Sequence, residues 1–157
     1  MGFFDSVFEP PFRRKRNGRY VINLSPEERG LIADLVEQLR ELLSTDSPAL
    51  RRLFPPPYGD DDERNEGYAV LAGAELIERR MAALDLVSST LEAEDLSEDD
   101  LDAWMRSIND IRLVLGTALD VTEDGLAPED DDPQAPMYAA YEYLGMLLER
   151  IVRSLSG

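Results

Sequence analysis

The sequence predicts a mainly α-helical fold, with about five helices in an antiparallel or orthogonal bundle and a short N-terminal β-hairpin. Apolar residues recur every three or four positions along most of the chain, which is the period of a helix with one buried face. Capping signals precede two of these stretches, and an Asn-Gly pair separates two short alternating segments near the N-terminus. The 157 residues are 43% apolar, which is enough for the core of a single domain.

The hairpin is predicted from residues 12–16 and 19–24, joined by Asn17-Gly18. Asn-Gly readily takes the positive φ angles of a two-residue type I′ turn, whose twist matches that of the paired strands. The second strand has one apolar face, formed by Tyr20, Ile22 and Leu24. Because two isolated strands are only marginally stable, we expect the hairpin to pack on a helix or on a partner.

The first helix is predicted to begin at Ser25. Glu28 completes a capping box with Ser25, and Pro26 suits the first turn, where its missing donor costs nothing. An apolar stripe at helical spacing follows, made of Ile32, Leu35, Val36, Leu39, Leu42 and Leu43.

Four further helices are predicted along the rest of the chain. A short one covers about 46–54 and ends at the three prolines that follow, which lack backbone donors. Longer helices are predicted over about 65–91, from Ser97 to about 119, and over about 137–155. The helix after Ser97 is apolar on more than one side at 113–115, so we expect it to be central.

Charge is unevenly distributed along the chain. Residues 1–24 carry five basic and two acidic groups, a net charge of +3, whereas residues 25–157 carry a net −20. We therefore expect an N-terminal tail and basic hairpin (1–24) packed on an acidic helical body (25–157), within one domain.

The basic residues of the hairpin are the predicted partner-binding surface: Arg13, Arg14, Lys15, Arg16 and Arg19. Such a run could bind phosphate, an acidic protein face, or the acidic body of a second copy in a homodimer. It could also serve only to block aggregation at an exposed strand edge. Because the acidic body repels DNA at close range, nucleic-acid binding is expected to be weak.

The composition excludes several classes of chemistry. The chain has neither cysteine nor histidine, so it has no disulfide, thiolate ligand, thiol switch or histidine base. It also lacks a glycine-rich phosphate loop, and no apolar run is long enough to cross a membrane. We expect a cytoplasmic, non-enzymatic protein with no catalytic residues, no cofactor and no membrane contact.

One acidic segment imitates a calcium-binding loop. Residues 120–131 place oxygen-bearing side chains around Gly125, but position 9 of the loop is Pro128 and position 12 is Asp131 where a glutamate is usual. We interpret this segment and the Asp runs at 60–62 and 130–132 as solvated loops, so no metal ligand is predicted.

Polar residues interrupt the apolar helix that follows Ser97. They are Asn109, Asp110 and Arg112, and we interpret Arg112 as the partner of a carboxylate that determines helix packing. Trp104 in the same helix is predicted to organise the core.

Two segments carry a family resemblance. One is Pro48-Ala49-Leu50-Arg51-Arg52-Leu53-Phe54-Pro55-Pro56, with Arg51, Arg52 and Phe54; the other is Ile108-Asn109-Asp110-Ile111-Arg112-Leu113-Val114-Leu115-Gly116-Thr117. With the arginine-rich segment before Ser25, they make the chain resemble the actinobacterial AosR-like family, a domain of unknown function described as oxidative-stress-responsive transcriptional regulators.

The resemblance implies a cytoplasmic regulator that works through RNA polymerase and a stress sigma factor. In the family's redox mode, a disulfide between paired cysteines permits the partner interaction. Because this chain has no cysteine, that mode does not transfer to it. Two alternatives stay open: a regulator that binds DNA directly through the hairpin, and a protein that binds divalent cations through its carboxylates.

Overall fold

The computed structural model describes residues 10–45, 48–50, 53, 62–119 and 132–157. It confirms a mainly helical fold with an N-terminal hairpin. The helices are α2 (Pro26–Leu42), α3 (Asp62–Thr90), α4 (Glu98–Ala118) and α5 (Ala135–Ser156), with one 3-10 turn, η1 (Pro48–Leu50). The strands are β1 (Phe12–Arg14), β2 (Tyr20–Ile22) and β3 (Asp95–Leu96).

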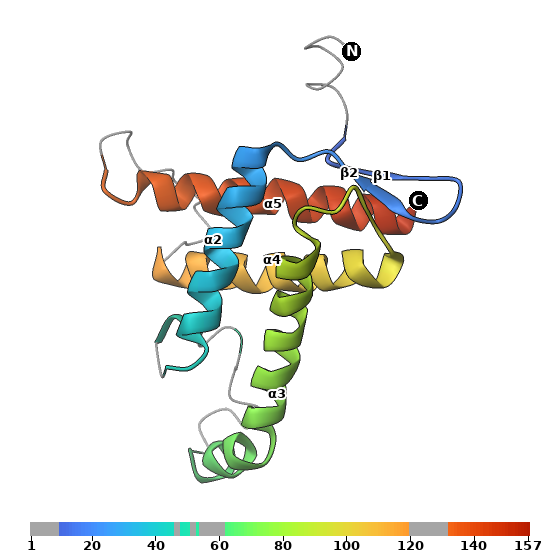
Figure 1. Cartoon of the computed structure of the whole chain (residues 1–157). Coiled ribbons are helices and arrows are strands. Elements are labelled where there is room, and N and C mark those ends of the chain that lie inside the picture. Colours follow the sequence, from blue (N-terminus) through green and yellow to red (C-terminus); the bar gives the residue numbers. More distant parts are fainter. Residues whose placement is uncertain (1–9, 46–47, 51–52, 54–61, 120–131) are drawn as a thin grey trace.

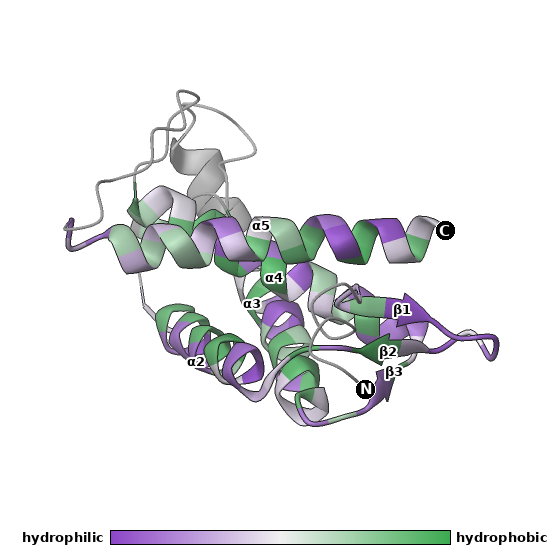
Figure 2. Ribbon diagram, turned by 90° about the horizontal axis from the view of Figure 1, so that it is seen from above, coloured by the Kyte–Doolittle hydropathy of each residue, from purple (hydrophilic) through white to green (hydrophobic). Residues whose placement is uncertain are grey.

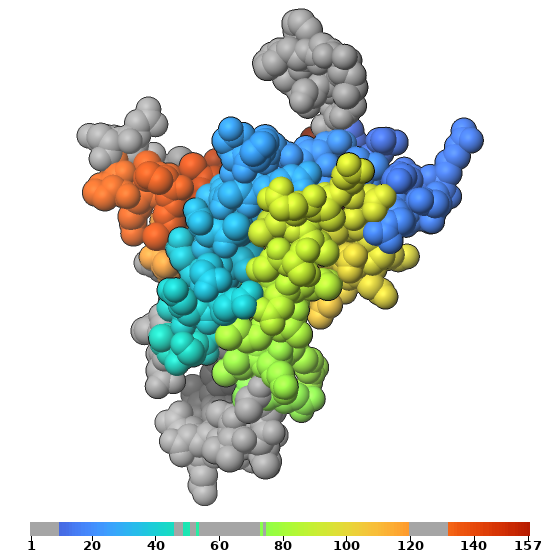
Figure 3. All heavy atoms as spheres, viewed as in Figure 1, coloured from blue at the N-terminus to red at the C-terminus, as the bar shows by residue number. Residues whose placement is uncertain are grey.

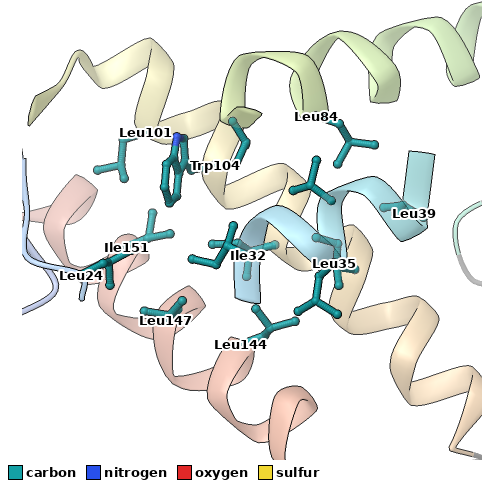
Figure 4. Packing of buried hydrophobic residues seen from close by; sticks show 14 of the residues in the cluster. Leu24, Ile32, Leu35, Leu39, Leu84, Leu101, Trp104, Leu144, Leu147 and Ile151 are labelled. Carbon is teal, nitrogen blue, oxygen red and sulfur yellow. The ribbon is translucent and has the colours of Figure 1, made fainter. Parts of the chain in front are cut away.

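The helices form two antiparallel pairs that cross each other. Figure 1 shows α2 beside α3 and α4 beside α5, with the first pair running across the second. Helix α4 contacts α2, α3 and α5, so the helix that is apolar on more than one side lies at the centre, as predicted. In Figure 4, labelled side chains from all four helices, Trp104 among them, point into the space between the helices.

The capping box predicted at Ser25 is present, and the helix start predicted at Ser97 also has a capping box. At the start of α2, the Ser25 hydroxyl accepts a hydrogen bond from the Glu28 N–H, and the Glu28 carboxylate accepts one from the Ser25 N–H, each at 3.1 Å. At the start of α4, Ser97 and Asp100 form the same reciprocal pair, at 3.0 and 3.2 Å. Local side-chain chemistry therefore determines where both helices begin.

The predicted short second helix, at about 46–54, lies largely outside the described residues. Within the described residues of 46–54 only the three-residue turn η1 is helical. The long helix also begins at Asp62, somewhat before the expected 65, and the last one at Ala135.

The predicted hairpin gains a third strand. β2 pairs antiparallel with β1 and with β3, in which Leu96 lies opposite Tyr20. The two residues of β3 were not recognisable as a strand because they pair with a partner far away in the sequence. The sheet has one buried face, made by Phe12, Tyr20, Ile22 and Leu96, and this face joins the helical core.

The hairpin turn also differs from the predicted two-residue type. Gly18 N–H donates to the Lys15 carbonyl at 3.1 Å, and Lys15 N–H donates to the Arg19 carbonyl at 2.6 Å. The loop therefore contains three residues, 16–18, and Gly18 has a φ of +83°. This is the three-residue hairpin in which a glycine takes the left-handed position, so only one positive φ is needed.

Candidate functional site

The basic residues of the hairpin gather at its projecting end. We call Arg13, Arg14, Lys15, Arg16 and Arg19 the basic tip. Figure 2 shows the strongly hydrophilic loop between β1 and β2 extending beyond the helices, and the hairpin protrudes at the edge of the space-filling view in Figure 3. Arg13, Arg14 and Arg16 are exposed.

One aspartate of β3 neutralises part of the basic tip. Lys15 Nζ lies 3.0 Å from Asp95 Oδ2, and Arg19 Nε lies 2.8 Å from Asp95 Oδ1. These hydrogen bonds, from Arg19 first and Lys15 second, hold the pKa of the Asp95 carboxyl below its ordinary value. Two cations thus fasten the hairpin to β3, and three guanidinium groups are left exposed for carboxylates or phosphates.

An arginine that sequence reasoning missed anchors the sheet to the helices. The Arg29 guanidinium donates to the carbonyl oxygens of Leu91 at 2.5 Å and Ala93 at 3.1 Å, beyond the end of α3. It also donates to the carbonyls of Leu24 at 3.1 Å and Ile22 at 3.3 Å. In the sequence Arg29 resembles any solvated charge in a first helical turn, because its acceptors are backbone groups of other elements.

A half-buried tyrosine connects α5 to the start of α2. Tyr143 Oη donates to Glu28 Oε2 at 2.6 Å, so Glu28 serves the capping box and a tertiary contact together. Burial, and then the neighbouring Glu28 carboxylate, raise the pKa of the Tyr143 hydroxyl well above its ordinary value. Tyr143 is therefore protonated in this fold and donates its hydrogen bond to Glu28.

Trp104 lies at the junction of sheet and helices. Its side chain is fully buried, and its Nε1 donates to Thr90 Oγ1 of α3 at 2.8 Å. The Phe12 ring of β1 meets it edge to face, with ring centroids 6.0 Å apart. The indole thus contacts β1 and α3 from its position on α4.

A second group of charges lines a groove between α3 and α4, with a volume of about 330 Å³. We call it the α3–α4 groove; its described lining is Leu76, Arg79, Arg80 and Ala83 from α3, with Arg106, Asn109 and Asp110 from α4. Arg80 Nη1 lies 2.5 Å from Asp110 Oδ1, and Arg80 Nη2 donates to the Leu53 carbonyl at 3.1 Å. Burial raises the pKa of the Asp110 carboxyl above its ordinary value, against the lowering effect of Arg80.

The rim of this groove carries two exposed arginines, one from each helix. Arg79 pairs with Glu75 and Arg106 pairs with Asp102, each at 3.0 Å and one turn apart on its own helix. Exposed pairs of this kind stabilise a helix by about 0.3–0.5 kcal/mol, so both guanidinium groups exchange partners readily.

Arg112 does not pair with a carboxylate as interpreted from the sequence. Across the described part of the chain it forms no ion pair; its guanidinium carbon lies 4.6 Å from the centroid of the Tyr141 ring on α5. A Cβ atom at Gly145 would lie 3.1 Å from Arg112 Nε. Gly145 therefore allows the arginine to lie flat against α5 and stack on the tyrosine.

Several sequence features lie outside the described residues: Arg51, Arg52, Phe54 and the calcium-like segment 120–131. Within the described ranges, no group of three or more carboxylates is arranged to hold a metal ion. None of the helices, in the parts of the chain that the structure covers, is long and apolar enough to span a bilayer.

Comparison with known proteins gives family relationships. Residues 9–155 match the model of DUF2017, a domain of unknown function. The chain is 32% identical over 130 residues to proteins named oxidative stress regulator AosR from Mycobacterium tuberculosis and Mycobacterium bovis. These matches cover 70% of this chain but 59% of each relative, so the chain spans little more than half the length of these relatives. No solved structure matches significantly.

Proposed function

This chain belongs to the DUF2017 family, and from that premise we propose that it is a non-enzymatic regulator of transcription in the oxidative stress response. It acts by binding a protein of the transcription machinery, RNA polymerase or its sigma factor. The regulator role is supported by the names of its relatives, which share 32% of aligned residues with it.

The observation that carries a binding role is the basic tip. Arg13, Arg14 and Arg16 are exposed on a hairpin that projects from a protein with a net charge of −17. Arginine is enriched at protein interfaces because its planar guanidinium binds carboxylates through two parallel hydrogen bonds. An acidic patch on the partner therefore fits the basic tip, while the acidic body keeps other acidic proteins away.

Regulation in this chain does not use a thiol. The sequence contains no cysteine, so oxidants form no disulfide in it. Partner binding is accordingly insensitive to diamide, a thiol oxidant.

The test is to measure the affinity of the purified protein for RNA polymerase core enzyme and for holoenzyme, with and without diamide. The double variant Arg14→Gln with Arg16→Gln is expected to bind at least tenfold more weakly. The matched control is Arg150→Gln with Arg153→Gln, which removes the same charge from exposed positions on α5. Equal affinity of both variants removes the basic tip from the interface, and absence of binding to either polymerase form contradicts the proposed partner.

A direct DNA-binding regulator is the second candidate, because the same three exposed arginines could contact phosphates. Binding to duplex DNA would then fall steeply as salt is raised, by an amount set by the number of phosphates neutralised. Detectable duplex binding at low salt, lost in Arg14→Gln with Arg16→Gln and accompanied by no polymerase binding, favours this candidate over the first.

A further inference from the structure

We propose that the α3–α4 groove binds a short acidic segment of a partner protein. An apolar side chain of that segment occupies the groove, and its carboxylates meet the arginines at the rim. The inference deepens the proposed function, on which it rests for the premise that this protein acts by binding other proteins.

The lining of the groove is much richer in arginine than the chain as a whole. Its described lining contains Arg79, Arg80 and Arg106 against the single carboxylate of Asp110, whereas the chain carries a net charge of −17. Each of these arginines already has an ion pair, Arg80 with Asp110 and the two rim arginines with exposed carboxylates of their own helices, so an acidic ligand binds by replacing those exposed carboxylates.

The inner part of the groove is suited to an apolar group. Leu76 and Ala83 provide apolar lining, and the nearby Arg80 guanidinium already binds Asp110 and the Leu53 carbonyl. A bare anion entering this far would approach the Asp110 carboxylate, which repels it. The inner groove therefore favours an apolar side chain over an isolated phosphate ion.

The rim, by contrast, is suited to carboxylates. Arg79 and Arg106 lie on the two opposite walls, and among the described residues each is paired with an exposed carboxylate of its own helix. A carboxylate of the partner replaces Glu75 or Asp102 at little cost and gains a bidentate, charge-assisted pair. Asn109 adds an amide that makes no side-chain hydrogen bond to any described residue.

The size of the groove limits its occupant. A volume of about 330 Å³ is at the lower end for ligand pockets, which take one small molecule. It therefore accommodates one or two side chains of an extended or helical segment, and the rest of that segment lies across the rim. An apolar anchor surrounded by charged contacts is the usual arrangement of a small protein interface.

The probe is a synthetic twelve-residue peptide in which two leucines are flanked on each side by glutamates. It is titrated into the full-length ¹⁵N-labelled protein, and a second peptide carries glutamine in place of every glutamate. We expect amide shifts to concentrate at residues 76–83 and 106–110 with the glutamate peptide, and at least fivefold weaker binding of the glutamine peptide.

The variant is Arg79→Gln with Arg106→Gln, expected to weaken peptide binding at least fivefold. The control is again Arg150→Gln with Arg153→Gln, expected to change it less than twofold. Arg153 matches Arg79 closely: each side chain is 66% exposed and each pairs with a glutamate one turn earlier. The control therefore removes the same charge and the same kind of pair at another place.

Four results overturn the proposal: no shifts in the groove at millimolar peptide, equal weakening by both variants, equal binding of the glutamine peptide, or displacement of the peptide by inorganic phosphate. A dimer seen by sedimentation that dissociates in Arg79→Gln with Arg106→Gln would assign the groove to a second copy and also overturn it. The peptide titration contains no polymerase. Failure of the peptide to bind the groove therefore leaves the polymerase-binding test valid, and failure to bind polymerase leaves the peptide result valid.

Discussion

The basic tip and the α3–α4 groove are two arginine-rich surfaces on one acidic protein, and they are built in different ways. In the basic tip, five cations lie within seven consecutive residues, on strands whose other side chains Phe12, Tyr20 and Ile22 are buried in the core. In the groove, the arginines come from two helices, and Arg80 is held by a buried aspartate. Charged residues of the tip can therefore be substituted without disturbing the core. In the groove, by contrast, the pair of Arg80 and Asp110 also joins α3 to α4.

The largest expected effect is a loss of stability, and it compares a buried residue of the hairpin with an exposed residue of the basic tip. Phe12→Ala removes a buried ring that contacts Trp104, and should lower the free energy of unfolding by about 4 kcal/mol. Arg14→Ala in the same strand should change it by less than about 0.5 kcal/mol. Urea denaturation measures both; a small loss for Phe12→Ala would mean that the hairpin does not belong to the cooperative core.

The next effect tests the groove. Arg80→Ala leaves Asp110 without its cation and should lower the free energy of unfolding by about 2 kcal/mol, less than for a fully buried pair because Arg80 is 25% exposed. Arg79→Ala on the same helix, at 66% exposure, should cost less than about 0.5 kcal/mol. Similar losses of unfolding free energy in the two variants would show that the pair of Arg80 and Asp110 contributes no more than an exposed pair.

The two aspartates should titrate on opposite sides of their ordinary pKa of 3.8. Cation pairing lowers the pKa of Asp95, so its stabilising contribution is present above pH 3.8 and is lost as the pH falls through the folded-state value. Burial raises the pKa of Asp110, so its contribution is present below 3.8 and is lost as the pH rises through the folded-state value. Carboxyl ¹³C shifts followed against pH measure both; midpoints on the same side would contradict the contrast.

The smallest expected effect concerns the attachment of the tip. Asp95→Asn removes the charge that holds Lys15 and Arg19, both partly exposed, so the unfolding midpoint should move little. Amide hydrogens of residues 15–19 should nevertheless exchange faster, because the hairpin loses its ion pairs to β3. Wild-type protein in 0.5 M salt serves as the comparison and should show part of the same change, since salt screens exposed pairs. Unchanged exchange would mean that backbone pairing alone orders the tip.

Local signals in the sequence were sufficient for many elements and insufficient where partners are distant. The helix starts at Ser25 and Ser97 were predicted correctly because the residues that cap each helix lie within four positions of one another. Strand β3 was missed because its two residues acquire strand geometry only by pairing with β2. Arg29 was missed for the same reason, since its acceptors beyond α3 lie 62 and 64 residues away.

The candidate sites likewise contain residues that the sequence identified and contacts that it did not. The basic tip is a continuous run, so its residues could be named from the sequence, although the choice of Lys15 and Arg19 as the pair bound to Asp95 could not. Asn109 and Asp110 were named as polar interruptions of a helix, but Arg80 was not foreseen as the partner of Asp110. Arg112 was expected to meet a carboxylate and instead stacks on Tyr141.

The sequence by itself determined the mainly helical class, the starts of α2 and α4, the central place of α4, the cationic hairpin, and the absence of any thiol or imidazole chemistry. These depend on composition, on the helical period and on contacts within a few residues. The tertiary structure alone decided the third strand, the anchoring by Arg29, the partners of Asp95 and Asp110, and the α3–α4 groove. Each of these joins groups far apart in the chain, and their meeting depends on how the helices cross as the apolar core is buried.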